Sequence, residues 1–352
     1  MKKTCLTCLL FLGILTGVAA AQSWSSYGPT PRYGHSAVFD SSSKQMIVFG
    51  GFSASGGQTL DADTWRLLPS ASRSGLQNWV AVHPAGTPPP GRGGHFAGYA
   101  PTSNRMVIFG GQAAGGCVND AWVLTNANGH GGQTGWSQLA AQGTPPPARK
   151  NFGGAYDPVS NTLMVQDGYD CSTSTPIDDY WILSNANGLG GTPTWVEVNT
   201  GSNRPGPRFG HNAAYDPTTN ELIIFGGTNG QRFGNYEDLW VLSNANGIGG
   251  ASAWKQISTL GKPPAGEYWP FIYDPVSNVM TLYAGGFIYY LSYANGVGGI
   301  PTWTYSGGNS PIKPGGDSQG TIVYDASRDA IILFGGSLKD VNVYLFSPAG
   351  GQ

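Results

Sequence analysis

The sequence predicts an all-β fold, a six-bladed β-propeller whose ring is closed by an N-terminal strand. Three observations support this prediction. A unit of four short apolar runs recurs with a period of 50 to 60 residues. The last copy lacks its fourth run, and a spare run of the right kind stands near the N-terminus. Closing a ring of sheets in this way removes exposed strand edges, which otherwise invite aggregation.

The clearest copy of the unit is Pro207 to Ile257, with the apolar runs HNAAY, ELIIF, DLWVL and AWKQI. Each run has the length of a β-strand, and Gly, Pro, Asn or Asp bounds each one. Such a unit is typical of a four-stranded antiparallel meander. A single sheet of this kind leaves both faces in water, so it needs neighbours to pack against.

The neighbouring copies are marked by glycine pairs and by tryptophans at fixed spacing. Gly226-Gly227 recurs as Gly50-Gly51, Gly110-Gly111, Gly285-Gly286 and Gly335-Gly336, and as Asp167-Gly168 in one copy. Trp240 recurs as Trp65, Trp122 and Trp181, with Tyr289 and Tyr344 in the last two copies. Fourteen residues after each of the first five stands a second tryptophan: Trp79, Trp136, Trp195, Trp254 and Trp303. A repeat this regular indicates a closed array of similar sheets.

The sixth copy predicts how the ring closes. Fourteen residues beyond Tyr344 would lie past Gln352, so this copy has no fourth strand. Trp24, in the run SWSSY, precedes the first complete copy. We therefore expect the strand around Trp24 to complete the last blade.

An apolar strand followed by Gly-Gly, an aromatic residue and a spaced tryptophan resembles the kelch repeat, and the likeness covers nearly all of residues 22–352. Pro-Arg-x-Gly-His, complete at residues 31–35 and 207–211, and Asn-Ala-Asn-Gly are similar to motifs of kelch repeats of secreted bacterial proteins, in the superfamily of the galactose oxidase central domain. This resemblance implies one propeller domain over residues 22–352. It leaves function open, because kelch propellers include enzymes, protein-binding modules and carbohydrate-binding modules.

Residues 1–21 predict a secretory signal peptide. Lys2 and Lys3 precede an apolar run from Cys5 to Val18, and three alanines follow at a cleavage site. The run is too short for a membrane span. The whole chain has a formal net charge of −2, and loss of two lysines makes it about −4. Such a charge-poor chain argues against nucleic acid and anionic membranes as partners. From the signal peptide we expect secretion or a periplasmic location.

Cys117 and Cys171 are the cysteines that remain after cleavage of the signal peptide. Each follows the glycine position of its repeat, between the second and third strands of neighbouring blades. In an exported chain, two such cysteines favour a disulfide over two separate thiols.

The connections between strands fall on two faces. The turns between third and fourth strands are nearly identical (NANGHGG, NANGLGG, NANGIGG, YANGVGG), which favours a structural role over binding of a sugar or an ion. The loops that lead into the first strand and join the second to the third differ in length and composition, and some are stiffened by proline. We call the second set the variable face and the first the repeated face. The variable face is the predicted binding face.

The candidate ligand-binding residues on the variable face are Arg32, Arg92, Arg149, Lys150, Arg208, Glu267, Tyr268 and Asp317. Two interpretations of the arginines remain open. They can bind carbonyls and the periodic aspartates within the scaffold, or they can converge on a carboxylate or an oxygen-rich ligand. The residues that break the repeat, such as Lys150 and Glu267, are the better indication of function.

Histidines share one repeat position, as His35, His95 and His211, but Phe152 and Trp269 replace them elsewhere. This pattern favours a packed position over a metal site. No cofactor or metal is predicted.

We expect a binding module for a protein or glycan ligand. The alternative is a carbohydrate-active enzyme similar to kelch-type sialic acid mutarotases, with Glu267 as the acid and Arg149 and Arg208 holding the substrate.

Overall fold

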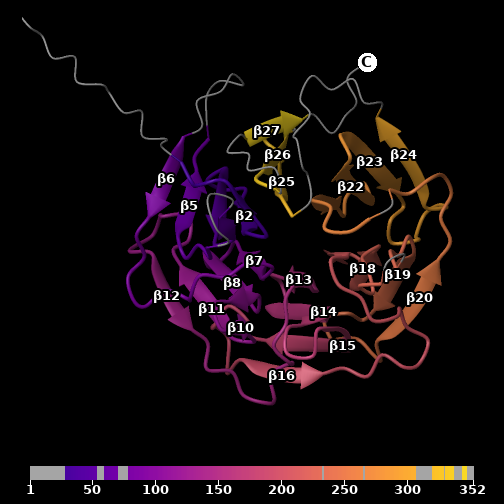
Figure 1. Cartoon of the computed structure of the whole chain (residues 1–352), viewed down its shortest axis with the longest axis horizontal. Helices are drawn as coiled ribbons and strands as arrows, with labels where there is room; N and C mark the ends of the chain where they lie inside the picture. The colour runs from indigo at the N-terminus through magenta and orange to yellow at the C-terminus, as the bar shows by residue number, and fades with distance from the viewer. Residues whose placement is uncertain are drawn as a thin grey trace, which may run out of the picture.

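The computed structural model describes residues 28–53, 59–69, 78–231, 234–264, 266–306, 319–328 and 330–336, and the backbone of 343–346. Its sheets lie side by side around a common centre, so that the described part of the chain forms a disc (Figure 1). Among these residues the regular elements are all β-strands, and none forms a helix that could span a membrane. The all-β propeller prediction is confirmed.

Five sheets have four antiparallel strands each, and their strands follow one another in chain order. They are β2 (Ser36–Asp40), β3 (Gln45–Phe49), β5 (Thr64–Leu67) and β6 (Trp79–Val82); β7 (Phe96–Ala100), β8 (Arg105–Phe109), β11 (Ala121–Thr125) and β12 (Gly135–Gln138); β13 (Gly153–Asp157), β14 (Thr162–Asp170), β15 (Thr175–Ser184) and β16 (Thr194–Glu197); β17 (Asn212–Asp216), β18 (Glu221–Phe225), β19 (Leu239–Ser243) and β20 (Ala253–Ile257); β21 (Phe271–Asp274), β22 (Val279–Ala284), β23 (Phe287–Ser292) and β24 (Thr302–Ser306). We refer to them as blades 1 to 5.

The last sheet has three strands, β25 (Thr321–Asp325), β26 (Ala330–Phe334) and β27 (Val343–Phe346). The described residues therefore contain five complete blades rather than the six that the sequence predicts. The three-stranded sheet packs against blade 1, where Val323 and Phe334 share a cluster with Met46 and Val48. The strand around Trp24, which we expected to complete this sheet, lies outside the described residues.

The hydrophobic core lies between neighbouring blades, and the periodic tryptophans build it. In blades 1, 2, 3 and 5, the tryptophan of the outermost strand packs on the phenylalanine that ends the second strand of the preceding sheet, whereas Trp254 of blade 4 lies near Tyr180. Ring centroids are 5.0 Å apart for Trp136 and Phe49 and 4.8 Å apart for Trp195 and Phe109. A repeat of this kind cannot bury its apolar face alone, so the spacing of the tryptophans reflects stacking of one sheet on the next.

A cycle of backbone hydrogen bonds surrounds the centre of the disc. One residue just ahead of each innermost strand donates its N–H to the carbonyl of the equivalent residue in the preceding sheet, at 2.7 to 2.9 Å. The six residues are Gly34, Gly94, Asn151, Gly210, Tyr268 and Gln319. All have positive φ, which suits glycine but strains larger residues, as at Tyr268 (φ 60°) and Gln319 (φ 63°). Where the repeat has no glycine here, a side chain stands at the rim of the centre.

Candidate binding site on the variable face

The four scaffold arginines, Arg32, Arg92, Arg149 and Arg208, are fully buried. In blade 3, the two terminal nitrogens of Arg149 donate to the two carboxylate oxygens of Asp179 at 2.5 and 2.6 Å. One of them also donates to the carbonyl of Asp167 at 2.7 Å. The other three arginines repeat this pattern with Asp63, Asp120 and Asp238.

These contacts are those of the scaffold interpretation. Every guanidinium has a paired carboxylate and a backbone acceptor, which is what a buried cation requires. Neither of the two central cavities that the described residues enclose is lined by any of the four. The structure therefore does not bring the arginines to a common ligand position.

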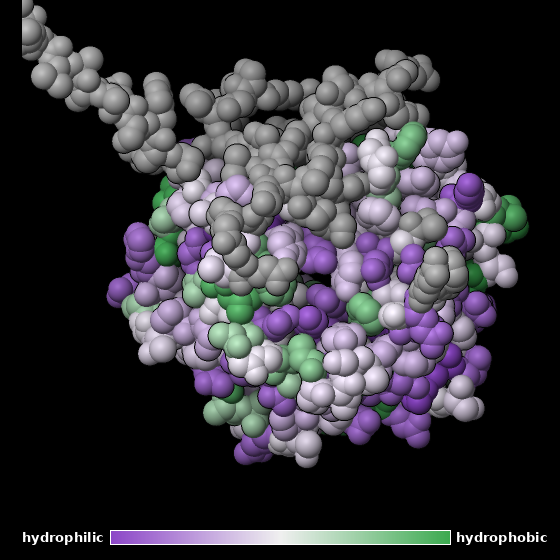
Figure 2. Space-filling model, viewed as in Figure 1, coloured by the Kyte–Doolittle hydropathy of each residue, from purple (hydrophilic) through white to green (hydrophobic). Residues whose placement is uncertain are grey.

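The mouth cavity opens on the variable face and has a volume of ≈ 420 Å³. It is lined by side chains from the B–C loops, which join the second and third strands, and from the residues that precede the innermost strands. They are Tyr33, Phe52, Gln112, Lys150, Asn151, Tyr169, Phe209, Tyr268 and Gln319. A hollow is visible at the centre of the disc in the space-filling view (Figure 2).

Five aromatic rings form much of the wall of the mouth cavity. Tyr33 and Phe52 stack at 5.1 Å, because the short strands β1 (Arg32–Tyr33) and β4 (Phe52–Ser53) pair with each other. Phe209 lies 4.9 Å from Tyr169 and 6.3 Å from Tyr268, centroid to centroid. The wall is therefore built before any ligand arrives, since each ring is held by a neighbour.

Lys150 supplies a positive charge to the mouth cavity. Its Nζ donates to Gln112 Oε1 at 2.6 Å and lies 5.5 Å from the centroid of the Tyr169 ring. Burial lowers the pKa of the Lys150 amine from its usual value. The amine is half-buried and held in position by these two contacts.

A disulfide joins the two loops on either side of Lys150. Cys117 and Cys171 are bonded, with Cα atoms 5.4 Å apart, which confirms the predicted pairing. Cys117 lies in β10 (Gly116–Cys117) and pairs with Gln112 in β9 (Gln112–Ala113). Cys171 follows Tyr169 by two residues. The crosslink therefore fixes the loops that carry Gln112 and Tyr169, which are the two contacts of Lys150.

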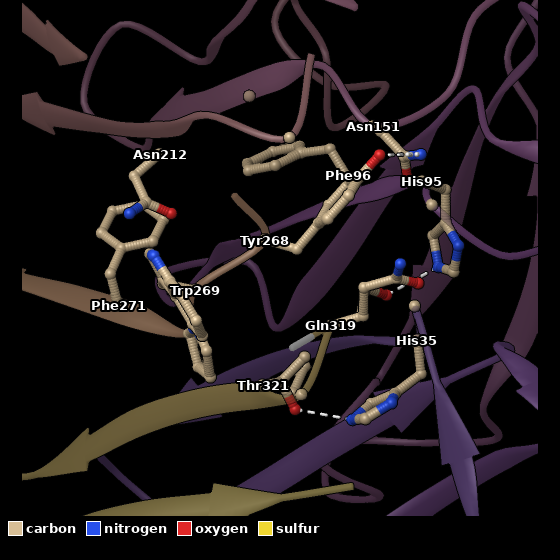
Figure 3. Close-up of a pocket in the computed structure, with 18 of the residues that line it drawn as sticks. His35, His95, Phe96, Asn151, Asn212, Tyr268, Trp269, Phe271, Gln319 and Thr321 are labelled. Atoms are coloured by element: carbon tan, nitrogen blue, oxygen red, sulfur yellow. Dashed lines mark hydrogen bonds between the residues drawn. The ribbon is translucent and has the colours of Figure 1, made fainter. Parts of the chain in front are cut away.

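The channel cavity lies deeper, has a volume of ≈ 320 Å³ and shares three lining residues, Asn151, Tyr268 and Gln319, with the mouth cavity. Asn151 Nδ2 donates to the hydroxyl of Tyr268 at 3.4 Å, and Figure 3 shows these two side chains meeting. The three shared residues are the non-glycine members of the backbone cycle. They form the partition between the two cavities.

The three periodic histidines line the channel cavity. His35 Nε2 is 2.7 Å from Thr321 Oγ1 (Figure 3), and His95 Nε2 is 2.7 Å from Ser36 Oγ. Burial lowers the pKa of His35 to about 3, and it holds the pKa of His95 and His211 well below the usual value. All three are neutral at neutral pH. The described residues contain no cluster of three or more His, Cys, Asp or Glu placed to hold a metal ion.

The remaining sequence-predicted residues differ in where they lie. Tyr268 lines both cavities, whereas Glu267, the next residue back, lines neither and is half-buried. Burial raises the pKa of Glu267 above its usual value. The enzyme alternative requires Glu267, Arg149 and Arg208 to share a ligand site, and none of the three lines either central cavity. Asp317 lies outside the described residues.

Several lining residues were not singled out from the sequence. Gln112, Tyr169 and Phe52 lie in the B–C loops, and Asn151 and Gln319 take part in the backbone cycle. The signal for the last two was present: both replace the glycine that Gly34, Gly94 and Gly210 supply at the same repeat position. In the sequence, each replacement looks like the loss of a glycine from a turn. The backbone cycle shows that each one adds a side chain to the rim of the centre.

The fold and the buried Arg–Asp pairs together define a kelch-type β-propeller. Residues 9–188 match the family model described as the KLHDC2/KLHL20/DRC7 Kelch-repeats domain. This match spans half of the chain, and the chain belongs to the kelch-repeat family.

Two curated proteins show the same relationship. An F-box/kelch-repeat protein, At1g51550 of Arabidopsis thaliana, is 29% identical over 256 residues, which cover 67% of this chain and 50% of the relative. The tRNA wybutosine-synthesizing protein 4 of Aspergillus fumigatus is 31% identical over 80 residues, 23% of this chain and 7% of the relative. The matched region spans half or less of the length of these relatives, so their activities as whole proteins do not carry over.

Proposed function

We propose that this protein is a binding module that takes a protein or glycan ligand in the mouth cavity of its variable face. One observation carries the proposal. The mouth cavity is lined by side chains that differ from blade to blade, whereas the four buried scaffold arginines follow the repeat. A scaffold of identical blades makes rigid walls, and individual side chains on its loops supply specificity.

The rigidity of the site supports binding. Stacked rings, the Cys117–Cys171 disulfide and the backbone cycle hold the wall in place. A preorganised site avoids the entropy cost of ordering loops and side chains when the ligand arrives, and this raises affinity without further contacts. Kelch propellers commonly act as interaction modules, in agreement with this proposal.

The proposal is tested by screening purified residues 22–352 against arrays of glycans and of secreted proteins. The double variant Lys150→Ala/Phe209→Ala should weaken binding of the ligand found by about tenfold or more, since it removes a cation and an aromatic anchor. The matched control is Leu189→Ala/Ile248→Ala on the repeated face, where the side chains are 43% and 58% exposed. Its affinity should stay within about twofold of the parent. If only the control variant loses binding, the ligand binds the repeated face and the proposal is wrong.

We also propose that the strand around Trp24 completes the three-stranded sheet as a sixth blade. The packing of Phe334 on Trp79 of blade 1, with centroids 4.8 Å apart, supports this arrangement because it repeats the contact between successive complete blades. Deleting residues 23–27 should lower the melting temperature by many degrees. An unchanged melting temperature would show that the segment pairs with no sheet.

We propose that residues 1–21 are a signal peptide that directs export of the chain and is then cleaved. The disulfide supports it, because structural disulfides persist mainly in oxidising compartments. Mass spectrometry of the protein recovered outside the cytoplasm should give an N-terminus near residue 22. Recovery of the intact N-terminus would contradict cleavage.

A further inference from the structure

Lys150 is the only charged residue among the described residues that line the mouth cavity. Its ammonium has three hydrogens, and its hydrogen bond to Gln112 Oε1 uses one of them. The contrast with the scaffold arginines is direct, because each of those has an aspartate within 2.5 or 2.6 Å. A half-buried cation with a neutral partner is a place where an anionic ligand gains a charge-assisted hydrogen bond.

The other lining groups are neutral and of two kinds. Five are aromatic rings, and three are the side-chain amides of Gln112, Asn151 and Gln319. Amides both donate and accept hydrogen bonds, which matches the hydroxyl groups of a sugar. Aromatic rings present flat apolar faces, which match the C–H face of a pyranose. A cavity of ≈ 420 Å³ also lies within the range of about 300–1,000 Å³ that holds small ligands or single units of larger ones.

We propose that the mouth cavity binds a pyranose that carries one carboxylate, such as a hexuronate unit of a polysaccharide. This inference rests on the proposed function and names the ligand class of that same site. One cation balances one carboxylate. A phosphate, with a charge of about −1.5 to −2, would leave excess negative charge against neutral walls.

Within the cavity, the carboxylate pairs with the Nζ of Lys150, and the sugar ring lies against the aromatic wall to which Tyr169 and Phe209 contribute. The sugar hydroxyl groups form hydrogen bonds with the side-chain amides of Asn151 and Gln319, which belong to the partition. Lys150 is already held by Gln112 and by the ring of Tyr169, so binding orders little that is not ordered beforehand.

Isothermal titration calorimetry of residues 22–352 with trigalacturonate and with its methyl ester tests the proposal. The two probes have the same rings and hydroxyl groups and differ in charge. The acid should bind about tenfold or more tightly than the ester, because a charge-assisted hydrogen bond contributes more than a neutral one. Equal affinities, or no binding of the acid, would overturn the inference.

The variant Lys150→Met removes the charge and keeps an unbranched side chain. It should lose the tenfold preference for the acid while its affinity for the ester stays within about twofold. Lys255→Met, at an exposed lysine of the outermost strand β20, is the matched control and should keep the preference. If Lys150→Met weakens both probes equally, the loss is structural and the assignment of the carboxylate to Lys150 is wrong.

Failure of this inference can be told apart from failure of the proposed function. A protein or neutral glycan whose binding is abolished by Lys150→Ala/Phe209→Ala, together with no binding of trigalacturonate, would leave the mouth as the binding site and remove the hexuronate. Insensitivity of every ligand to the mouth variants would remove both.

Discussion

The two faces of the disc use the same kinds of residue for opposite purposes. On the repeated face, the second asparagine of each NANG turn reaches the neighbouring blade. Asn246 Nδ2 donates to Asp157 Oδ2 at 3.0 Å, and Asn295 Nδ2 donates to Asp216 Oδ2 at 2.8 Å. On the variable face, the amides of Asn151, Gln112 and Gln319 line a cavity instead.

In a repeat protein, periodicity separates the residues of the scaffold from those of the site. A polar residue that recurs in every blade satisfies a need that every blade has, such as linking to its neighbour or capping a buried carbonyl. The scaffold arginines and the NANG asparagines are residues of this kind. A polar residue that breaks the repeat, such as Lys150 or Asn151, has no such need to meet. Its place in a cavity is therefore the stronger indication of function.

The largest effect is expected from breaking a scaffold pair. Arg92→Met removes the guanidinium that donates to Asp120 and to the carbonyls of Gly110 and Pro90. Removing one partner of a buried ion pair costs about 3–5 kcal/mol, so urea denaturation should show a loss of that size. The control is Arg204→Met, whose pair with Asp178 is exposed and should contribute less than about 1 kcal/mol. Equal losses would show that the periodic arginines are not the scaffold.

The disulfide connects the comparison to the binding site. Cys117→Ser/Cys171→Ser should lower the free energy of unfolding by about 2–4 kcal/mol, because the crosslink spans 54 residues and restricts the unfolded chain. It should also weaken ligand binding, since the loops that carry Gln112 and Tyr169 lose their connection. Chemical denaturation and calorimetry measure the two effects. Full affinity in the double variant would show that the mouth does not depend on the crosslink.

A smaller loss is expected on the repeated face. Asn246→Ala removes a donor to the buried carboxylate of Asp157, at a cost of about 1.5–3 kcal/mol. Asn187→Ala, in the equivalent turn of blade 3, removes a bond to the hydroxyl of Ser103 and should cost about 0.5–1.5 kcal/mol. Neither should change ligand affinity. A drop in affinity with either variant would contradict the scaffold role of this face.

Asp167 offers the smallest and most specific test, because it stands where the other sheets have glycine. Burial, and then the charge of Asp178, raise the pKa of Asp167 well above its usual value. A raised carboxyl pKa means that its contribution to stability is complete below the usual pKa of 3.8 and is lost as pH rises toward the folded value.

Asp167→Asn cannot ionise, and its amide oxygen can still accept the N–H of Asp179. Its melting temperature relative to the parent should therefore rise as the pH increases above 3.8. Asp170→Asn, at a partly exposed aspartate whose pKa is lowered by a hydrogen bond from Ser172, should show no such gain. A difference that does not change with pH would show that Asp167 is ionised in the folded chain.

Much of the fold could be predicted because the period reports packing directly. Trp195 recurs where it does because it packs on Phe109 of the preceding blade, and the same distance along the chain gives the same contact in the next blade. Cys117 and Cys171 both follow the glycine position of their repeats, which predicts that they lie in neighbouring loops on one face. The disulfide was predicted from this placement.

The site was harder to predict because spacing gives the position of a residue but not the direction of its side chain. Arg149 and Lys150 are adjacent at the rim, yet Arg149 turns back to Asp179 and Lys150 reaches Gln112. Whether a residue faces the scaffold or the cavity depends on the pleat and on the left-handed residue that follows, Asn151 (φ 55°). The long-range neighbours that complete the mouth, such as Phe52 beside Tyr33, come from loops without a fixed repeat length.

Hydrogen–deuterium exchange of residues 22–352 with and without the ligand distinguishes the binding face from the scaffold face. We predict slower exchange in the bound state at residues 148–152, 167–171 and 207–211, which border the mouth. The NANG turns at residues 126–133, 185–192 and 244–251 should exchange at the same rate with and without ligand. Protection confined to those turns would contradict the assignment of scaffold and binding roles to the two faces.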